Sequence, residues 1–143
     1  MSEGKPVKQV IVIRKDLKMR RGKEIAQGAH AAMAWMSLRL REHIFRELPG
    51  REDGIEGHLA TIVMSDAEMA WVEGNFRKVV CQVDSLEELT RIHEAAQEAG
   101  LESRLITDAG ITEFGKIPTV TALAVGPDYD ERMDPITGKL ELY

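Results

Sequence analysis

Residues 15–34, KDLKMRRGKEIAQGAHAAMA, decide the fold. They follow a short, continuous apolar run, so a buried strand over residues 7–14 is predicted to lead through a basic loop into a helix. The apolar side of that helix is expected to comprise Ile25, Ala29, Ala32, Met36 and Leu40. Lys23, Gln27 and His30 fall at i, i+4 and i+7 and are predicted to share another stripe. Such a helix start, beside further cations, is typical of a site for a polyanion with a reacting group.

Further along the chain, helix and strand signals alternate. The predicted helices cover residues 22–47, 66–72 and 86–99, and the predicted strands cover residues 7–14, 78–83, 103–106 and 119–125. This order predicts a single three-layer α/β/α domain over residues 1–143, built on a four-stranded mixed β-sheet. Some disorder is expected within residues 1–6, and residues 39–70 resemble an insertion.

Charge and composition limit the function classes. The net charge is −5, but residues 1–30 hold eight Lys or Arg and three Asp or Glu, a net +5, which leaves −10 on the rest. Such a focused positive patch can bind phosphates. Cys81 is the sole cysteine, which excludes an intrachain disulfide and a cysteine-based metal motif. Neither a membrane-spanning run nor a signal-peptide pattern occurs, so we expect a cytoplasmic protein without membrane contact, metal or cofactor.

The predicted chemistry centres on Lys23 and Asp108. In open α/β sheets, sites collect beyond the carboxyl ends of strands. The first strand leads to Lys23 and the third ends near Asp108, so the two meet if these strands are parallel neighbours. A carboxylate near a lysine and the Thr112 hydroxyl suits metal-free hydrolysis. In it, Asp108 orients or deprotonates a water, and Lys23 holds the charge state of Asp108 or stabilises an oxyanion. The sequence has no motif for nucleotide hydrolysis, dinucleotide binding or zinc.

Other interpretations of these residues stay open. A turn-forming role explains Asp108 about as well as catalysis does, and Thr112 is also typical of a turn. For His30, which stays among the catalytic candidates, a packed histidine bonded to the backbone is favoured over a general base. The acidic residues 128, 130, 131 and 134 are predicted to form a solvated loop.

Several of these segments together resemble the type 2 peptidyl-tRNA hydrolases, the archaeal and eukaryotic class. The N-terminal signature is carried by Asp16-Leu17-Lys18-Met19, Gly22-Lys23, Ala26-Gln27 and Ala29-His30-Ala31-Ala32. A second signature is carried by Asp108-Ala109-Gly110-x-Thr112-Glu113. Residues 74–80 resemble the family's second strand, and residues 126–127 and 134–143 resemble its C-terminal strand and tail. The likeness spans nearly the whole chain in the right order.

The resemblance implies a homodimer with a four-stranded mixed sheet. It also implies cofactor-free hydrolysis of the ester between a peptide and the 3′ ribose of tRNA, which frees the tRNA. By similarity, the residues implicated in activity are Lys23, Asp108 and Thr112, and the supporting or substrate-contacting ones are Lys18, Gln27, His30 and Thr121. Arg20 and Arg21 stand where the family usually has Gly and Lys, and we assign them, with Lys18, to the tRNA phosphates.

Two rival functions differ in class from this one. The first is a catalytically inactive module of the same fold that binds RNA or a protein partner. The trio of Lys23, Asp108 and Thr112 argues against it, because a pure binder has no need of them. The second is a small α/β enzyme that acts on another ester or amide. Hydrolysis of peptidyl-tRNA is the function that the sequence predicts.

Overall fold

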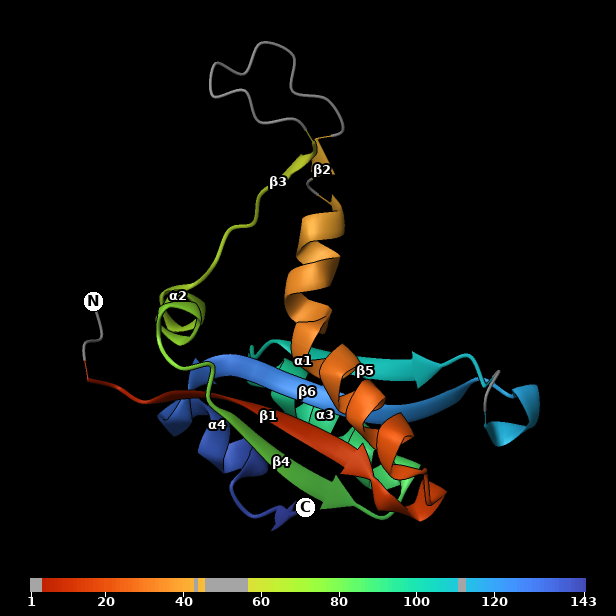
Figure 1. Ribbon diagram of the computed structural model, residues 1–143. Coiled ribbons are helices and arrows are strands. Elements are labelled where there is room, and N and C mark those ends of the chain that lie inside the picture. Colours follow the sequence, from red (N-terminus) through yellow and green to blue (C-terminus); the bar gives the residue numbers. More distant parts are fainter. Residues whose placement is uncertain (1–3, 43, 46–56, 111–112) are drawn as a thin grey trace.

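The computed structural model describes residues 4–42, 44–45, 57–110 and 113–143 (Figure 1). Its helices are α1 (Arg21–Glu42), α2 (Asp66–Glu73), α3 (Leu86–Glu98) and α4 (Asp130–Thr137), with 3-10 turns η1 (Lys15–Leu17) and η2 (Phe114–Lys116). Its strands are β1 (Val7–Arg14), β2 (Ile44–Phe45), β3 (Leu59–Ala60), β4 (Lys78–Val83), β5 (Ser103–Asp108), β6 (Thr119–Tyr129) and β7 (Glu141–Leu142). The predicted disorder within residues 1–6 and the predicted insertion at residues 39–70 lie partly outside the described residues.

The main sheet is mixed and has five strands in the order β5-β6-β1-β4-β7. The four-stranded prediction is therefore wrong by one strand, β7, which pairs antiparallel with β4. With two exposed residues, β7 is too short to show an alternating pattern. A separate two-stranded sheet of β2 and β3 was likewise not predicted.

The strands before Lys23 and Asp108 are parallel, but they are not neighbours. β1 pairs antiparallel with β6, and β6 pairs antiparallel with β5. β1 and β5 therefore point the same way across the intervening β6, as their arrows show in Figure 1. The expectation that β1 and β5 lie side by side is wrong. Lys23 and Asp108 can still meet, because the carboxyl ends of both strands lie at one end of the sheet.

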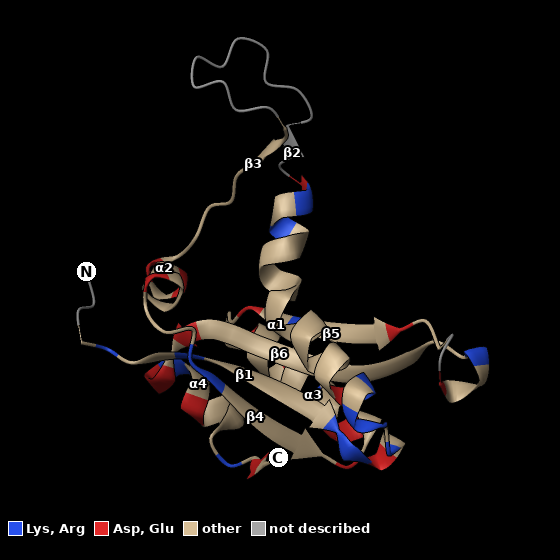
Figure 2. Ribbon diagram, in the orientation of Figure 1, with Lys and Arg blue, Asp and Glu red and all other residues tan. Residues whose placement is uncertain are grey.

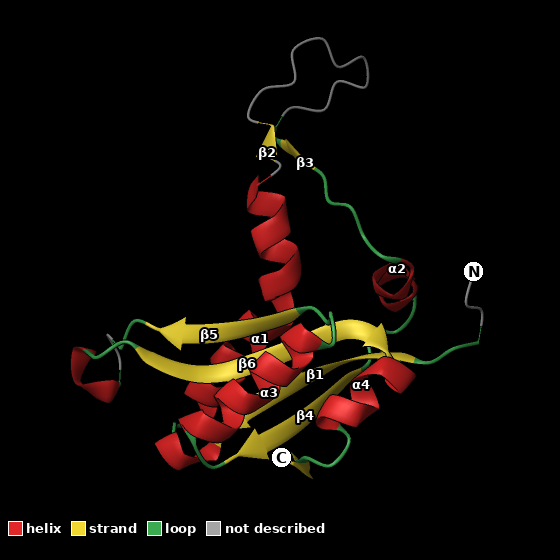
Figure 3. Cartoon of the chain, turned by 180° about the vertical axis from the view of Figure 1, so that it is seen from behind, coloured by secondary structure: helices red, strands yellow, loops and turns green. Residues whose placement is uncertain are grey.

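Helices cover both faces of the sheet (Figure 3). Alternate residues of a strand point to opposite faces, so Val10 and Val12 pack with Leu89 of α3 and Met133 of α4. Ile11, Ile13, Ala122 and Ala124 form a second cluster on the other face, with Ala31 of α1. This arrangement gives the helix–sheet–helix layers that the sequence predicts.

Helix α1 turns a different face to the sheet from the one predicted. Its buried residues are Gln27, Ala31 and Trp35. Of the predicted apolar face, Ile25 (66% exposed) and Ala29 are exposed, whereas Ala32, Met36 and Leu40 are half-buried, so that face is turned partly away from the sheet. Alanines lie on several sides of α1, so its apolar periodicity is weak. The packing of Trp35 and the hydrogen bonds of Gln27 fix the rotation of the helix instead.

The acidic stretch near residue 130 belongs partly to a helix, not to a solvated loop. The sequence did not predict this helix, α4, because α4 is short and polar and contains Pro135, which is unfavourable inside helices. Each acidic side chain has a cationic partner: Arg132 for Asp128, Arg77 for Asp130, Lys5 for Glu131 and Lys8 for Asp134. Three of these pairs fasten α4 to other parts of the fold, and the Arg132–Asp128 pair joins α4 to the end of β6.

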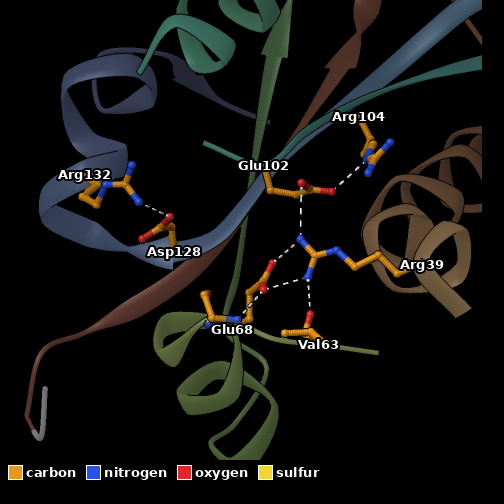
Figure 4. A network of polar contacts seen from close by, with 8 residues as sticks. Arg39, Val63, Glu68, Glu102, Arg104, Asp128 and Arg132 are labelled. Carbon is orange, nitrogen blue, oxygen red and sulfur yellow. Dashed lines mark hydrogen bonds and ion pairs between the residues drawn. The ribbon is translucent and has the colours of Figure 1, made fainter. Parts of the chain in front are cut away.

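An ion-pair network fastens the far end of α1 to α2 and β5 (Figure 4). The Arg39 guanidinium donates to both carboxylate oxygens of Glu68, at 2.8 Å each, and its Nη2 lies 3.4 Å from Glu102. Glu68 Oε1 also accepts from the backbone N–H of Ser65 at 2.8 Å, which completes a capping box at the start of α2. The carboxylates around Arg39 raise its pKa.

Candidate active site

Lys23 and Asp108 meet directly, as predicted. Lys23 Nζ, in the first turn of α1, donates to Asp108 Oδ1, at the end of β5, at 2.7 Å. The two side chains are 12% and 14% exposed, so both are shielded while part of each still reaches solvent. Such a pair can hold a negative and a positive charge at fixed positions next to a bound substrate.

Two further donors orient the Asp108 carboxylate. Gln27 Nε2 donates to Oδ1 at 3.3 Å, and the Gly110 N–H donates to Oδ2 at 2.8 Å. The Gly110 bond is the one a turn-forming aspartate makes, so the structural and the catalytic interpretations of Asp108 are compatible. Gly110 has φ +81°, and a Cβ there would lie 2.3 Å from the Ile117 carbonyl oxygen, which reserves this position for glycine.

A buried hydroxyl fixes the glutamine in turn. Thr121 Oγ1 donates to Gln27 Oε1 at 2.5 Å, so the amide NH₂ group is the end that faces Asp108. Both Gln27 and Thr121 are buried. Of the two roles implied by the resemblance, supporting or substrate-contacting, this burial favours the supporting one. The chain Thr121–Gln27–Asp108 links β6, α1 and β5 at one point.

The surroundings of Asp108 favour its ionised form. The Lys23 hydrogen bond and the Gly110 N–H, in that order, lower the pKa of this carboxyl below its ordinary value. A carboxylate with a low pKa is a weak base, but it still accepts a hydrogen bond from water. Of the two chemical roles considered for Asp108, orientation of water fits this environment better than full deprotonation.

Exposed cations gather beside this pair, at the start of α1 (Figure 2). Lys18, Arg20 and Arg21 are all exposed. Arg20 Nε lies 2.6 Å from Glu113 Oε1, so one predicted phosphate ligand is paired with a carboxylate in this structure. Lys18 adopts a left-handed conformation, with φ 52°, at the end of η1. Lys18 and Arg20 therefore precede the helix, and Arg21 is the first residue of α1.

Two catalytic candidates do not join the site as described. His30 shares a stripe of α1 with Lys23 and Gln27, as predicted, but its side chain is exposed, so the packed interpretation is wrong. It lies on the solvent side because α1 is rotated to bury Gln27 and Ala31. Thr112 lies outside the described residues, and its predicted role stays a prediction.

Glu113, Glu24 and Tyr143 were not predicted to act here, yet they contact the residues of the basic loop. No local pattern marks them, because their partners are distant in sequence. Within residues 4–42, 44–45, 57–110 and 113–143, no group of three or more His, Cys, Asp or Glu side chains is placed to hold a metal ion. In the same part of the chain, every helix is too short or too polar to cross a bilayer.

Comparison with known proteins identifies the family. The family model of peptidyl-tRNA hydrolase PTH2 matches residues 7–143. The chain belongs to this family. The peptidyl-tRNA hydrolase of Methanothermobacter thermautotrophicus is 39% identical over 136 residues, which cover 95% of this chain and 99% of the relative. Those of Methanopyrus kandleri and Methanocaldococcus jannaschii are 39% and 36% identical, over 94% and 95% of this chain and 97% and 99% of the relatives. The family predicted from the sequence is thus confirmed.

Proposed function

We propose that this chain is a peptidyl-tRNA hydrolase, which cleaves the ester between a peptide, or an N-substituted amino acid, and the 3′ end of tRNA. The observation that carries the proposal is the Lys23–Asp108 pair at 2.7 Å beside exposed cations. Its family and its full-length relatives support the same activity. The inactive-module alternative has no comparable support, because each side chain of the pair is in place.

In this proposal, water attacks the carbonyl carbon of the ester. Asp108, held ionised by Lys23 and Gly110, accepts a hydrogen bond from the water and aims it. The Lys23 ammonium stabilises the negative charge that develops on the carbonyl oxygen. The bond between the acyl carbon and the ribose 3′ oxygen breaks, the water proton ends on that oxygen, and a free carboxylic acid and tRNA leave. Thr112 is proposed to donate a hydrogen bond near the ester.

The tRNA backbone is proposed to contact Lys18, Arg20 and Arg21. A phosphate that binds Arg20 replaces the Glu113 carboxylate as its partner, which matches the exchange of one anion for another. The rest of the chain is acidic, so contact is expected to be confined to this end of the molecule. We expect tRNA affinity to fall steeply with salt, with a slope reduced by about 1 to 2 in the Arg20→Ala/Arg21→Ala variant.

A homodimer is proposed on one apolar surface. A groove of about 630 Å³ lies between α1 and β4, lined by Ile11, Ile13, Ala32 and Val80 among others. Exposed Ile25 and Met33 line it on the α1 side, so one patch offers both a ridge and a hollow, as a two-fold interface requires. Light scattering after gel filtration should give a dimer for the wild type and a monomer for Met33→Glu. A monomeric wild type would refute this.

The proposed location is the cytoplasm, where translation supplies peptidyl-tRNA. The buried thiol of Cys81 suits a reducing compartment. This part of the proposal rests on the substrate rather than on any targeting feature.

The test of the activity is release of N-acetylated amino acid from charged tRNA by the wild type, Lys23→Ala and Asp108→Ala. Turnover in the wild type with a loss of about 10²-fold or more in each variant supports the proposal. Wild-type rates in both variants would contradict it. Binding of tRNA with no turnover in the wild type would select the inactive module.

A further inference from the structure

Tyr143 joins three segments that are far apart in the sequence. Its backbone N–H donates to the Val80 carbonyl of β4 at 3.0 Å, just beyond the β7 pairing. Its hydroxyl accepts from Lys15 Nζ at 3.0 Å and donates to the Glu24 carboxylate. Lys15 Nζ also lies 4.2 Å from the centre of the Tyr143 ring and 3.5 Å from Glu24 Oε1. These three side chains, the Lys15–Glu24–Tyr143 cluster, form a closed set of mutual contacts.

The cluster brackets the basic loop. Lys15 begins η1, and Glu24 lies in the first turn of α1, so the exposed cations at 18, 20 and 21 fall between its two members. The Lys15 carbonyl accepts from the Lys18 N–H at 3.1 Å, and this bond closes the turn in which Lys18 is left-handed. Tyr143 therefore contacts the residue that anchors this turn and the helix that follows it.

Within the cluster, Tyr143 and Glu24 contact the Lys15 ammonium from several sides. The ring, the hydroxyl and Glu24 surround that charge, so it is held toward β7 and α1. Its neighbours in the loop are left to present their charges outward. A ligand that binds such a loop loses less conformational entropy than one that must first order it.

We infer that Tyr143 is a positioning residue that preorganises the basic loop for the phosphates of tRNA. The inference rests on the proposed function for its ligand and goes beyond it in assigning a role to a residue that touches neither Lys23 nor Asp108 in the bonds described. Tyr143 acts through Lys15 and Glu24, so its loss alters capture of the substrate and leaves the chemical step intact.

Three variants test this. Tyr143→Ala removes both ring and hydroxyl, and Tyr143→Phe keeps the ring over Lys15 but removes the hydroxyl bonds. Leu142→Ala is the matched control, because Leu142 is the residue before Tyr143, at the end of β7, and is exposed. For each protein, KM and kcat are measured on N-acetylated aminoacyl-tRNA. Hydrogen exchange of the Lys18 and Glu24 amides, which donate to Lys15 and Arg20, is measured on the free protein.

We expect Tyr143→Ala to raise KM about three- to tenfold with kcat within about twofold, and to speed exchange at Lys18. Tyr143→Phe should fall between it and the wild type, and Leu142→Ala should match the wild type. Unchanged KM and exchange in Tyr143→Ala would overturn the inference. The inference would also be overturned if Leu142→Ala had the same effect as Tyr143→Ala, or if Tyr143→Ala lowered kcat alone. A change in the oligomeric state of Tyr143→Ala that accounts for its effect would overturn it as well. If the wild type has no activity on tRNA, the proposed function fails, and the exchange measurement alone decides whether Tyr143 orders the loop.

Discussion

Helix α1 carries an ion pair near each end, and the two pairs differ in what their surroundings leave open. At its far end, Arg39 is matched to two carboxylates, and both oxygens of Glu68 are used by one guanidinium. At its start, Lys23 meets Asp108 beside exposed cations. Both contacts are short and shielded. What separates the two pairs is the group of exposed cations beside Lys23, so a short, shielded ion pair does not by itself mark a reactive site.

The contrast between the two ion pairs is tested by replacing each cation with methionine in a variant of its own. Lys23→Met should lower kcat about 10²- to 10³-fold, because it removes the charge that we propose stabilises the developing oxyanion. The melting temperature should also fall, because the shielded Asp108 carboxylate loses its cation. Single-turnover hydrolysis at saturating enzyme measures the effect. A kcat within threefold of the wild type would remove the distinction between the two pairs.

Arg39→Met is the matched variant on the same helix. It should leave kcat per folded molecule near the wild-type value but destabilise the fold by about 3 kcal/mol, since the shielded Glu68 carboxylate loses its cation while Glu102 keeps Arg104. Urea unfolding at pH 7 gives the free energy. An unaltered free energy with a large loss of kcat would show that the network serves catalysis.

Thr121→Val probes the layer beneath Asp108, with nearly unchanged shape. It deprives the buried Gln27 carbonyl of its donor, which should cost about 1–3 kcal/mol of stability. We expect kcat to fall about tenfold, because the amide no longer fixes Asp108. Thr119→Val is the control, because Thr119 lies two residues earlier on β6 and its hydroxyl donates to the Ile117 carbonyl. Equal kcat values for the two variants would argue against the chain Thr121–Gln27–Asp108.

The smallest expected effect is on stability against pH. Because the pKa of Asp108 is lower in the folded than in the unfolded state, its contribution is present above about pH 4 and is lost as pH falls through the folded value. Urea unfolding of the wild type between pH 7 and 3 should therefore show a steeper acid loss than that of Asp108→Asn. Parallel curves for the two proteins would mean that the pair does not stabilise the ionised carboxylate.

The sequence was sufficient where local rules act. The Ser-x-x-Glu patterns at residues 65–68 and 85–88 predict the starts of α2 and α3, and continuous β-branched runs predict β1 and β4. The meeting of Lys23 with Asp108 followed from the rule for strand ends, although β6 lies between the two strands. The rule succeeds because it depends on strand direction and not on adjacency.

The parts that were missed depend on contacts between distant residues. The rotation of α1 is set by Trp35 packing and by Gln27 bonds to β5 and β6, which periodicity in an alanine-rich helix does not reveal. The helix α4 depends on cations from elsewhere in the chain, such as Lys8 and Arg77. The role of Tyr143 near the basic loop likewise needs the β4–β7 pairing.

Glu68 serves two purposes with one atom, because Oε1 accepts both from Ser65 at the start of α2 and from Arg39 of α1. The local start of α2 and its docking on α1 are thus coupled events. We expect α2 to be helical only when α1 is seated, so that the two helices melt together as one cooperative unit rather than in succession.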